Sequence, residues 1–397
     1  MKIKGRIFDG NEIIENATVS FSTESGNIDY IDTEFKSNPS NRLGRDNITF
    51  LPGMIDTHMH LFGTQERSLE SWVLTSDIIL TANSINDLSH LINAGFTTVR
   101  TMGDKVSLEL SKAEKSGIIN SPAIISSGFS IAETGGDDDP KRFPLDFAKR
   151  VSYSYYADGP WECVKAVRKN IRAGAQSIKA YASSSFVGGG KIRDELSIEE
   201  LKAIAKESKK YGVQSAAHAY GESAIQNVVD AGFSSIEHGL GLTENQAEEI
   251  SSKKIFYTPT LSVYKAQREG SNPYRESFIK KHIQNEVKIA DTAGIKIAAG
   301  TDFVGSTEEK HGNNYLEAVY LADVIGNKKA LQAITSVAAQ CIGATNAGCI
   351  TKGYVADIIG VYGNPLEDIQ SLRPENVAVV IKRGKIIKNT SNILFDS

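Results

Sequence analysis

The sequence predicts an α/β protein: a (β/α)8 TIM-type barrel with a small β-sandwich domain formed by both chain termini. Three observations lead to this prediction. Short apolar runs recur through the middle of the chain, each after a helical stretch that ends in glycine. Both ends show alternating runs separated by turn residues, and no Gly-x-Gly-x-x-Gly turn follows an early strand. The last observation argues against an open doubly wound sheet, which is the main alternative.

The two ends of the chain are predicted to form one small β-domain. At the N-terminus the runs KIKGRIF, ATVSFS and NIDYI are separated by Asp-Gly and Ser-Gly turn signals. At the C-terminus the runs are ADIIGVY and VAVVIKRGKIIK, and the second folds back across Arg383-Gly384. Neither end has enough apolar residues to fold alone, so we expect residues 1–51 and 353–397 to pack together and residues 52–352 to form the catalytic barrel.

The barrel prediction rests on the rhythm of the middle segment. Five helical stretches end in NAG, RAG, KYG, DAG or TAG, where glycine supplies the left-handed residue that stops a helix. The segment Ile198–Tyr211 has the i, i+3, i+4 apolar spacing of an amphipathic helix. Eight apolar runs are expected to be parallel strands: Met54–His60, Thr97–Gly103, Ala123–Gly128, Ser177–Ser183, Val213–Ala219, Ser234–Gly239, Ile255–Leu261 and Ile295–Asp302.

Composition excludes several classes of function. The net charge is −4 and the basic residues are scattered, so no field would attract nucleic acid or anionic lipid. The three cysteines form no Cys-x-x-Cys pair, which is typical of reduced thiols. The chain has neither an apolar leader nor an uncharged apolar stretch of about 20 residues. We therefore expect a cytoplasmic protein without membrane partners.

Polar residues at the ends of the predicted strands point to a metal site. His58 and His60 stand two apart, which places both side chains on the same side of a strand. His218, His238 and Asp302 end three further runs, and catalytic groups of such barrels lie at these strand ends. A single strand-end histidine is more often a hydrogen-bonded core residue, but so many matching residues on separate strands favour a metal site. The other histidines are His90 and His282, predicted to be structural or at the surface, and His311, whose role stays open.

Lys179 lies inside the fourth apolar run, where an ammonium group is costly. Burial lowers the pKa of a lysine toward the neutral amine. A neutral amine can add CO2 to form a carbamate, whose two oxygens can bridge two cations. The alternative is that Lys179 pairs with Asp302 inside the barrel.

Five motifs resemble the amidohydrolase superfamily: PGMIDTHMHL, SIKAYAS, AAHAYG, SIEHG and AAGTDF. The resemblance covers nearly the whole chain. Within the superfamily, TTVRTMG, the TGG turn and HGNN are similar to the prolidase-like branch, which includes dipeptidases, N-acyl amino acid hydrolases and zinc-dependent arginine carboxypeptidases.

The resemblance implies a role for each residue. His58, His60 and Asp302 would hold a buried divalent metal ion, His218 and His238 a more exposed one, and carbamylated Lys179 would bridge both. Zinc is the first choice for such ligands, with manganese, cobalt or iron left open. A hydroxide shared by the two metals would attack the scissile carbonyl, and Asp302 would pass its proton to the leaving amine. Tyr220 would donate to the oxyanion or, alternatively, pack as a rim aromatic.

Candidate substrate contacts are less determined. The branch often carries a histidine after TGG, whereas this chain continues with three aspartates. Asp137 and Asp138 would favour a cationic substrate side chain, or they belong to a charged loop that never touches substrate. Arg100 would bind a free α-carboxylate, or it forms an ion pair inside the barrel. His311, in HGNN, is a further candidate.

We therefore expect hydrolysis of the amide bond before a C-terminal amino acid, with a basic residue favoured, in dipeptides or N-acyl amino acids. One alternative is a cyclic-amide hydrolase resembling imidazolonepropionase, and another is a non-catalytic scaffold. A homo-oligomer is expected from the family resemblance alone. The sequence leaves open the substrate and the metal used in the cell.

Overall fold

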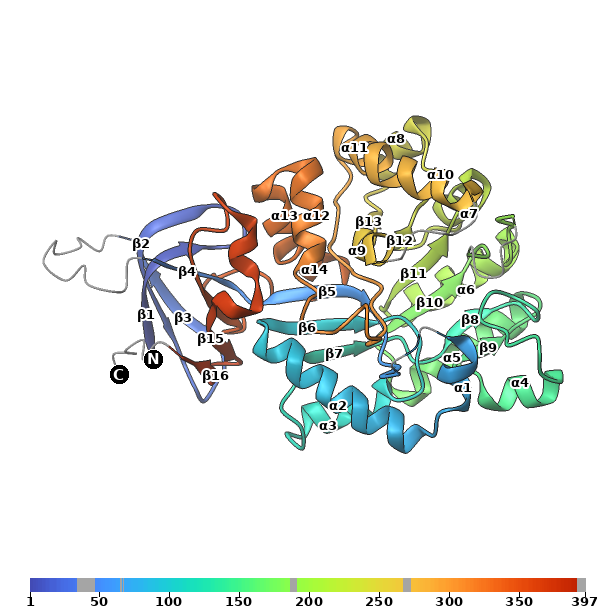
Figure 1. The fold of residues 1–397 in the computed structure, drawn as a ribbon, viewed down its shortest axis with the longest axis horizontal. Coiled ribbons are helices and arrows are strands. Elements are labelled where there is room, and N and C mark those ends of the chain that lie inside the picture. Colours follow the sequence, from blue (N-terminus) through green and yellow to red (C-terminus); the bar gives the residue numbers. More distant parts are fainter. Residues whose placement is uncertain (34–46, 65, 67, 186–190, 267–272, 391–397) are drawn as a thin grey trace, which may run out of the picture.

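The computed structural model describes residues 1–33, 47–64, 66, 68–185, 191–266 and 273–390. It confirms an α/β protein, in which a β-rich part holding both chain ends lies beside a larger part of strands and helices (Figure 1). Residues 34–46 and 391–397 of the predicted terminal domain lie outside the described residues.

Both ends of the chain contribute to one seven-stranded sheet, in the order β16-β15-β14-β4-β1-β2-β3. Its strands are β1 (Lys2–Phe8), β2 (Ile13–Phe21), β3 (Ile28–Asp32), β4 (Ile48–Pro52), β14 (Ile358–Tyr362), β15 (Val377–Lys382) and β16 (Lys385–Asn389). Strand β4 pairs with β1 on one side and with β14 on the other, so the strands form one continuous sheet rather than the two sheets of the predicted sandwich. The predicted hairpin turn is confirmed, with φ of 47° at Arg383 and 72° at Gly384. The domain boundaries themselves remain a proposal.

Seven of the eight predicted barrel strands are confirmed. They form two parallel ladders, β5-β6-β7 and β13-β12-β11-β10, and the second ladder is extended by β8 and β9. The bounds are β5 (Met54–Met59), β6 (Phe96–Thr101), β7 (Ala123–Ser126), β8 (Ser130–Ala132), β9 (Ser154–Tyr156), β10 (Ser177–Tyr181), β11 (Gln214–Ala219), β12 (Ser235–His238) and β13 (Phe256–Thr258).

The eighth predicted strand, Ile295–Asp302, is not a regular strand. It makes single bridges instead, from Ile297 to Tyr257, and just beyond its end from Phe303 to Met59. A side chain at Gly300 would approach the His58 backbone nitrogen to 2.8 Å, and Asp302 has a left-handed φ of 58°. This segment therefore departs from strand geometry, and the sheet pairing alone does not trace the closed eight-stranded barrel that was predicted.

Helices surround the two ladders (Figure 1). They are α1 (Leu69–Leu74), α2 (Asp77–Asn93), α3 (Ser107–Lys115), α4 (Leu145–Val151), α5 (Pro160–Ala173), α6 (Ile198–Lys210), α7 (Glu222–Ala231), α8 (Glu244–Ser252), α9 (Leu261–Ala266), α10 (Pro273–Lys281), the π-helical segment η2 (His282–Glu286), α11 (Val287–Thr292), α12 (Leu316–Ile325), α13 (Asn327–Ala333), α14 (Ser336–Cys341), and the 3-10 turns η3 (Ile369–Leu372) and η4 (Pro374–Asn376). The predicted amphipathic helix is α6. The five predicted glycine stops all have positive φ: Gly95, Gly174, Gly212, Gly232 and Gly294.

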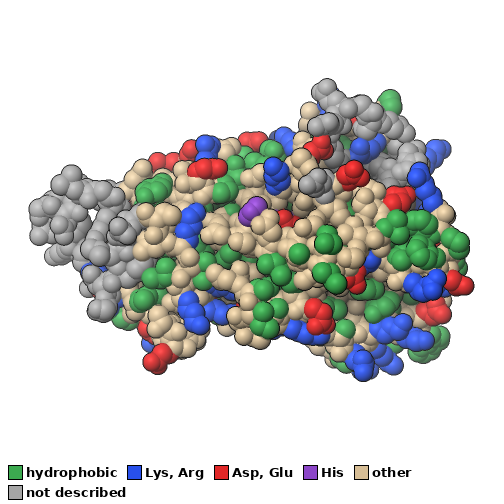
Figure 2. Space-filling view, turned by 60° about the horizontal axis from the view of Figure 1, so that its bottom comes forward, with side chains coloured by type: hydrophobic (Ala, Val, Ile, Leu, Met, Phe, Trp, Pro, Cys, Tyr) green, Lys and Arg blue, Asp and Glu red, His purple; other side chains and the backbone are tan. Residues whose placement is uncertain are grey.

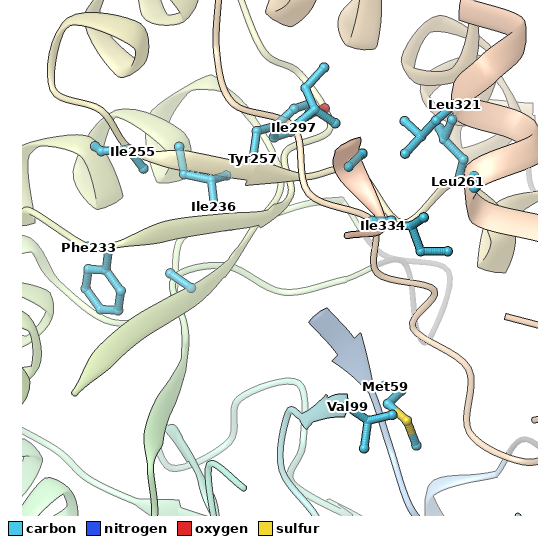
Figure 3. Close-up of a cluster of buried hydrophobic side chains, with 14 of the residues drawn as sticks. Met59, Val99, Phe233, Ile236, Ile255, Tyr257, Leu261, Ile297, Leu321 and Ile334 are labelled. Carbon is cyan, nitrogen blue, oxygen red and sulfur yellow. The ribbon is translucent and has the colours of Figure 1, made fainter. Parts of the chain in front are cut away.

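The main hydrophobic core lies between the strands and these helices. Figure 3 shows Ile236 and Tyr257 on neighbouring strands, Leu261 near Leu321, and Met59 beside Val99. A second cluster, which includes Ile7, Phe50 and Ile358, is formed within the terminal sheet. The cores hold β5 and β10–β12 in place, and the ends of these strands carry the polar residues described next.

Candidate active site

A cavity of about 440 Å³ lies where β5, β10, β11 and β12 end. All six predicted metal ligands line it: His58, His60, Lys179, His218, His238 and Asp302. The ring centroids of His58 and His238 are 4.9 Å apart, and those of His218 and His238 are 4.6 Å apart. The structure thus brings together the residues that the sequence placed on separate strands.

His58, His60 and Asp302 form what we call the inner group. Asp302 Oδ1 lies 3.3 Å from His58 Nε2 and 3.1 Å from His60 Nε2. One possible ligand atom from each residue lies within 4.8 Å of the others. Burial alone would raise the pKa of Asp302, but the neighbouring imidazoles of His58 and His60 hold it well below its usual value. Asp302 is therefore an ionised carboxylate.

The Nδ1 atoms of the inner histidines are anchored from behind. His58 Nδ1 lies 2.8 Å from Glu237 Oε2, and His60 Nδ1 donates to the Gly103 carbonyl at 2.9 Å. Each ring is thereby oriented with Nε2 toward Asp302, which is the usual arrangement of a metal-ligating histidine and its supporting hydrogen bond.

His218 and His238 form the outer group. His238 Nδ1 lies 2.8 Å from Thr260 Oγ1, and His218 Nε2 is buried without a hydrogen-bond partner. Burial, followed by the charge of Lys179, lowers the pKa of His218 well below its usual value, and burial has the same effect on His238. Both rings are therefore neutral and able to act as ligands.

Lys179 lies on β10 and is only 1% exposed. Burial lowers the pKa of its ammonium group to about 8, although the charges of Glu237 and Asp302 oppose this shift. A substantial fraction of neutral amine is therefore present at mildly alkaline pH, as the carbamate hypothesis requires.

Glu237 is a site residue that sequence reasoning missed. It is fully buried on β12 and joins His58 to Arg100, whose Nη2 donates to Glu237 Oε1 at 2.9 Å. Burial opposes ionisation of Glu237, but the Arg100 guanidinium and His58 lower its pKa to about 2. The signal was an acid inside the apolar run SIEHG, directly before His238.

Arg100 does not fit the predicted role of binding a substrate carboxylate. Its side chain is fully buried, it is not part of the cavity wall, and Nε donates to the Thr57 carbonyl at 2.6 Å. The position matches the alternative that the sequence left open, an ion pair inside the barrel. Because the guanidinium lies behind Glu237, it neutralises the carboxylate that orients His58.

His311 is also unsuited to contact substrate. It is 3% exposed, does not line the cavity, and its Nε2 donates to the His60 carbonyl at 3.0 Å. Nearby, Asn314 donates to Asp56 Oδ2 at 2.6 Å, and Asp56 Oδ1 accepts the His58 amide at 2.9 Å. His311 and Asn314 therefore hold the backbone of β5 and of His60, which follows it.

Asp137 and Asp138 both line the cavity. Asp138 accepts hydrogen bonds from the hydroxyls of Ser130, Tyr153 and Ser154 at 2.8, 2.9 and 2.7 Å. Asp137 is half-buried, and burial raises its pKa to about 6. Asp138 is committed to its neighbours, so Asp137 is the better candidate to meet a cation.

Tyr220 reaches the cavity beside the outer group. Its ring stacks on His218 with centroids 4.4 Å apart, and its hydroxyl lies 2.7 Å from that of Tyr264. Both roles predicted for Tyr220 are compatible with this position.

The loops after the first, third and eighth apolar runs form much of the cavity wall. They contribute Phe62, Leu69, Asp137, Asp138, Tyr153, Val304, Glu308 and Glu309. Ser185, Val263, Tyr264 and Arg275 also line the cavity, and the sequence did not single them out. The ring of Phe62 stacks on Trp72 at 4.3 Å and on His60 at 5.1 Å, so the wall next to the inner group is aromatic.

The six clustered residues fit divalent metal ions. They supply four imidazoles, of which those of His218 and His238 have lowered pKa values, one ionised carboxylate, and one amine of lowered pKa. Such donors suit zinc and its neighbours among the transition metals. Buried polar atoms are nearly always satisfied, so the Nε2 atom of His218, which has no hydrogen-bond partner, calls for a ligand.

Comparison with known proteins agrees with this geometry. Residues 49–387 match the amidohydrolase family. The chain belongs to the amidohydrolase family. Ochratoxinase of Aspergillus niger is 31% identical over 378 residues, which cover 85% of this chain and 75% of ochratoxinase. The crystal structure of that ochratoxinase has a TM-score of 0.88 at 27% identity and covers 98% of this amidohydrolase and 96% of its own chain.

Two further structures place this amidohydrolase in its branch. A Xaa-Pro dipeptidase with bound methionine has a TM-score of 0.83 at 29% identity, covering 98% of this chain and 99% of its own. A prolidase complexed with N-methylphosphonate-L-proline has a TM-score of 0.84 at 27% identity, covering 98% and 100%. The prolidase-like branch is thus confirmed, and these neighbours imply a TIM-like barrel with a β-domain. Family membership makes the protein a hydrolase of amide bonds.

Among the described residues, no helix is both long enough and apolar enough to cross a membrane. Figure 2 shows Lys and Arg interspersed with Asp and Glu over the face that it displays.

Proposed function

We propose that this amidohydrolase is a metal-dependent hydrolase that releases the C-terminal amino acid, preferably Arg or Lys, from dipeptides or N-acyl amino acids. The observation that carries the proposal is the convergence of four histidines, Lys179 and Asp302 on one cavity. Similarity to the Xaa-Pro dipeptidase supports a dipeptide as the substrate class.

The inner group would hold one divalent metal ion, the outer group a second, and Lys179 would bridge them as a carbamate. Zinc is the proposed metal, and the closed (β/α)8 barrel is the proposed frame. When bound, the ions supply an activated water and polarise the amide carbonyl.

Two side chains of the site would handle protons and charge. Asp302 is ionised and lies at the cavity, so it accepts a proton from the attacking water and passes it to the leaving amine. Tyr220 donates from its hydroxyl to the oxygen of the tetrahedral intermediate. The hydroxyl of Tyr264, 2.7 Å away, fixes the direction of that donor.

The cavity wall would select the substrate through charge. Asp137, Glu308 and Glu309 lie on it, and their carboxylates favour a cationic side chain. Arg275 also lies on the wall, and its planar guanidinium suits the free α-carboxylate of the released residue. Arg275 thus takes the role that the sequence had suggested for Arg100.

The test is amine release from dipeptides ending in Arg, Lys, Leu, Phe, Pro, Asp or Gly, by zinc-reconstituted protein treated with bicarbonate. Preferential cleavage before Arg and Lys, lost in Lys179→Ala, is expected. Asp137→Asn should reduce the preference for Arg over Leu by about tenfold, a loss of roughly 1.4 kcal/mol.

Other outcomes select the rivals. Activity on a hydantoin or imidazolone, with none on the peptides, would make the chain a cyclic-amide hydrolase. Protein that binds no metal, cleaves nothing and self-associates would be a scaffold. We also propose a homo-oligomer, for which light scattering should give a mass above that of one chain.

A further inference from the structure

The turn between β13 and α9 has a strained backbone. Thr260 has a φ of 51°, in the left-handed region that a β-branched residue rarely adopts. Such conformations persist where surrounding contacts over-determine them, often beside functional sites. The hydroxyl of Thr260 lies 2.8 Å from Nδ1 of His238, so the strained residue orients an outer-group histidine.

Contacts from two other elements hold this turn. His282 Nε2 donates to the Pro259 carbonyl at 2.9 Å. Glu317, on α12, accepts the backbone amides of Leu261 and Ser262 at 2.9 and 2.7 Å. The residues before and after Thr260 are therefore both fixed by buried side chains.

His282 is itself held by an unusual local structure. It begins the π-helical segment η2, which separates α10 from α11, and its Nδ1 lies 2.9 Å from Oε2 of Glu286 at the other end. Both side chains are fully buried. Single π turns inside helices are rare and often occur at functional sites. A buried polar pair costs desolvation, so conformational specificity is a reasonable role for it.

The same turn also supports the candidate oxyanion donor. Tyr264 lies one helical turn after Thr260, hydrogen-bonds to it, and contacts the Tyr220 hydroxyl at 2.7 Å. The ring of Tyr264 meets that of His282 edge to face, with centroids 5.4 Å apart. His282 therefore contacts both the turn that orients His238 and the tyrosine that meets the Tyr220 hydroxyl.

We propose that His282 is a positioning residue for the outer group. Held by Glu286 in the π-helical segment, it fixes the Pro259 carbonyl, which keeps Thr260 in its strained conformation and His238 directed at the cavity. This inference rests on the proposed two-metal function. It gives His282 a specific role, where the sequence suggested only a structural or surface residue.

The experiment measures zinc binding to metal-free protein against a chromophoric chelator, together with kcat and KM. His282→Leu should weaken the second zinc equivalent about tenfold and leave the first unchanged, because mutation of outer-shell partners typically costs 10–100-fold. The value of kcat should fall by a similar factor with little change in KM. His282→Gln, whose amide still donates to Pro259, should restore most of the affinity.

A double-mutant cycle separates positioning from general stability. If His282 acts through Thr260, His282→Leu should have no further effect on the second zinc in a Thr260→Val background. Glu114→Gln is the matched control, since Glu114 is a buried carboxylate paired with Lys382 and Arg383 far from the site. It should lower the unfolding midpoint and leave both zinc affinities unchanged.

Two results would overturn the positioning role: wild-type affinity for the second zinc in His282→Leu, or fully additive effects in the cycle. If His282→Leu does not fold, the cycle is run with Glu286→Gln, expected to weaken the second zinc about threefold in the wild-type background only. Wild-type protein that binds fewer than two zinc ions would overturn the proposed function and this inference together, whereas the first two results affect only the inference.

Discussion

The inner and outer groups of the site are held in different ways. The inner histidines are oriented by a carboxylate paired with an arginine and by a backbone carbonyl. Buried residues of the HGNN stretch fix the backbone of the strand beneath them. The outer His238 is oriented by one hydroxyl on a strained turn, which depends on residues of α12 and η2.

Because they are held differently, the inner and outer groups need not respond alike to mutation or to pH. Glu237, behind the inner group, is ionised throughout the usual pH range, because its pKa is about 2. Glu317, behind the outer group, has a pKa that burial raises to about 7. We therefore expect the geometry of the inner group to be insensitive to pH and that of the outer group to change with the ionisation of Glu317.

The largest effect is expected from breaking the inner group itself. Asp302→Asn removes the ionised carboxylate among the six clustered residues, which is the proposed metal ligand and proton acceptor. We expect kcat/KM to fall about a thousandfold or more, with loss of bound metal. Steady-state kinetics and elemental analysis measure both. Asp139→Asn, whose carboxylate accepts the Gly135 amide, is the control and should stay within a few-fold of wild type. More than a tenth of the activity left in Asp302→Asn would contradict its role.

The support behind the inner group should come next. Glu237→Gln leaves Arg100 as an uncompensated buried charge and weakens the orientation of His58. We expect a destabilisation of about 3 kcal/mol in urea unfolding and a 10–100-fold loss of affinity for the first zinc. Glu207→Gln, which breaks a pair with the half-exposed Arg168, should leave zinc binding unchanged. Equal losses in the two variants would show that the inner support is not specific.

A smaller effect is expected from the titration of Glu317. Its pKa in the folded protein is above the usual value of 4.5, so the folded state binds more protons between pH 4.5 and 7. The stabilisation is complete below about pH 4.5 and is lost as pH rises through about 7, a change of about 3 kcal/mol. Glu317→Gln should remove this part of the pH dependence in metal-free protein, measured by denaturant unfolding from pH 5 to 8. Exposed Glu248→Gln should leave the curve unchanged, and an unaltered curve in Glu317→Gln would contradict the assignment.

Much of the site could be predicted because its residues follow local patterns. The two-residue spacing of His58 and His60 and the strand-end positions of His218 and His238 need only strand geometry. Glu237 could not be placed this way, because it meets His58 across 179 residues of chain. The sequence allowed Arg100 to bind either a substrate carboxylate or an acid inside the barrel, and only the packing shows that its partner is Glu237.

The prediction of the fold was correct where local patterns decide the structure and wrong where tertiary contacts decide it. Alternation and glycine stops identified seven strands, but the eighth run is shaped by the close approach of Gly300 to His58. Likewise, the strain at Thr260 and the π-helical segment depend on tertiary contacts that no local pattern encodes.

The smallest effect is expected from removing the Tyr264 hydroxyl beside the outer group. Tyr264→Phe removes the hydroxyl that lies 2.7 Å from that of Tyr220 but keeps its ring beside His282. If Tyr220 donates to the reacting oxygen, losing this partner should lower kcat about threefold with KM unchanged, while Tyr220→Phe should lower kcat about a hundredfold. A Tyr220→Phe enzyme with wild-type kcat would make Tyr220 a packing residue. The proposed catalysis would then depend on the histidines, Lys179 and Asp302, without a side-chain donor from Tyr220.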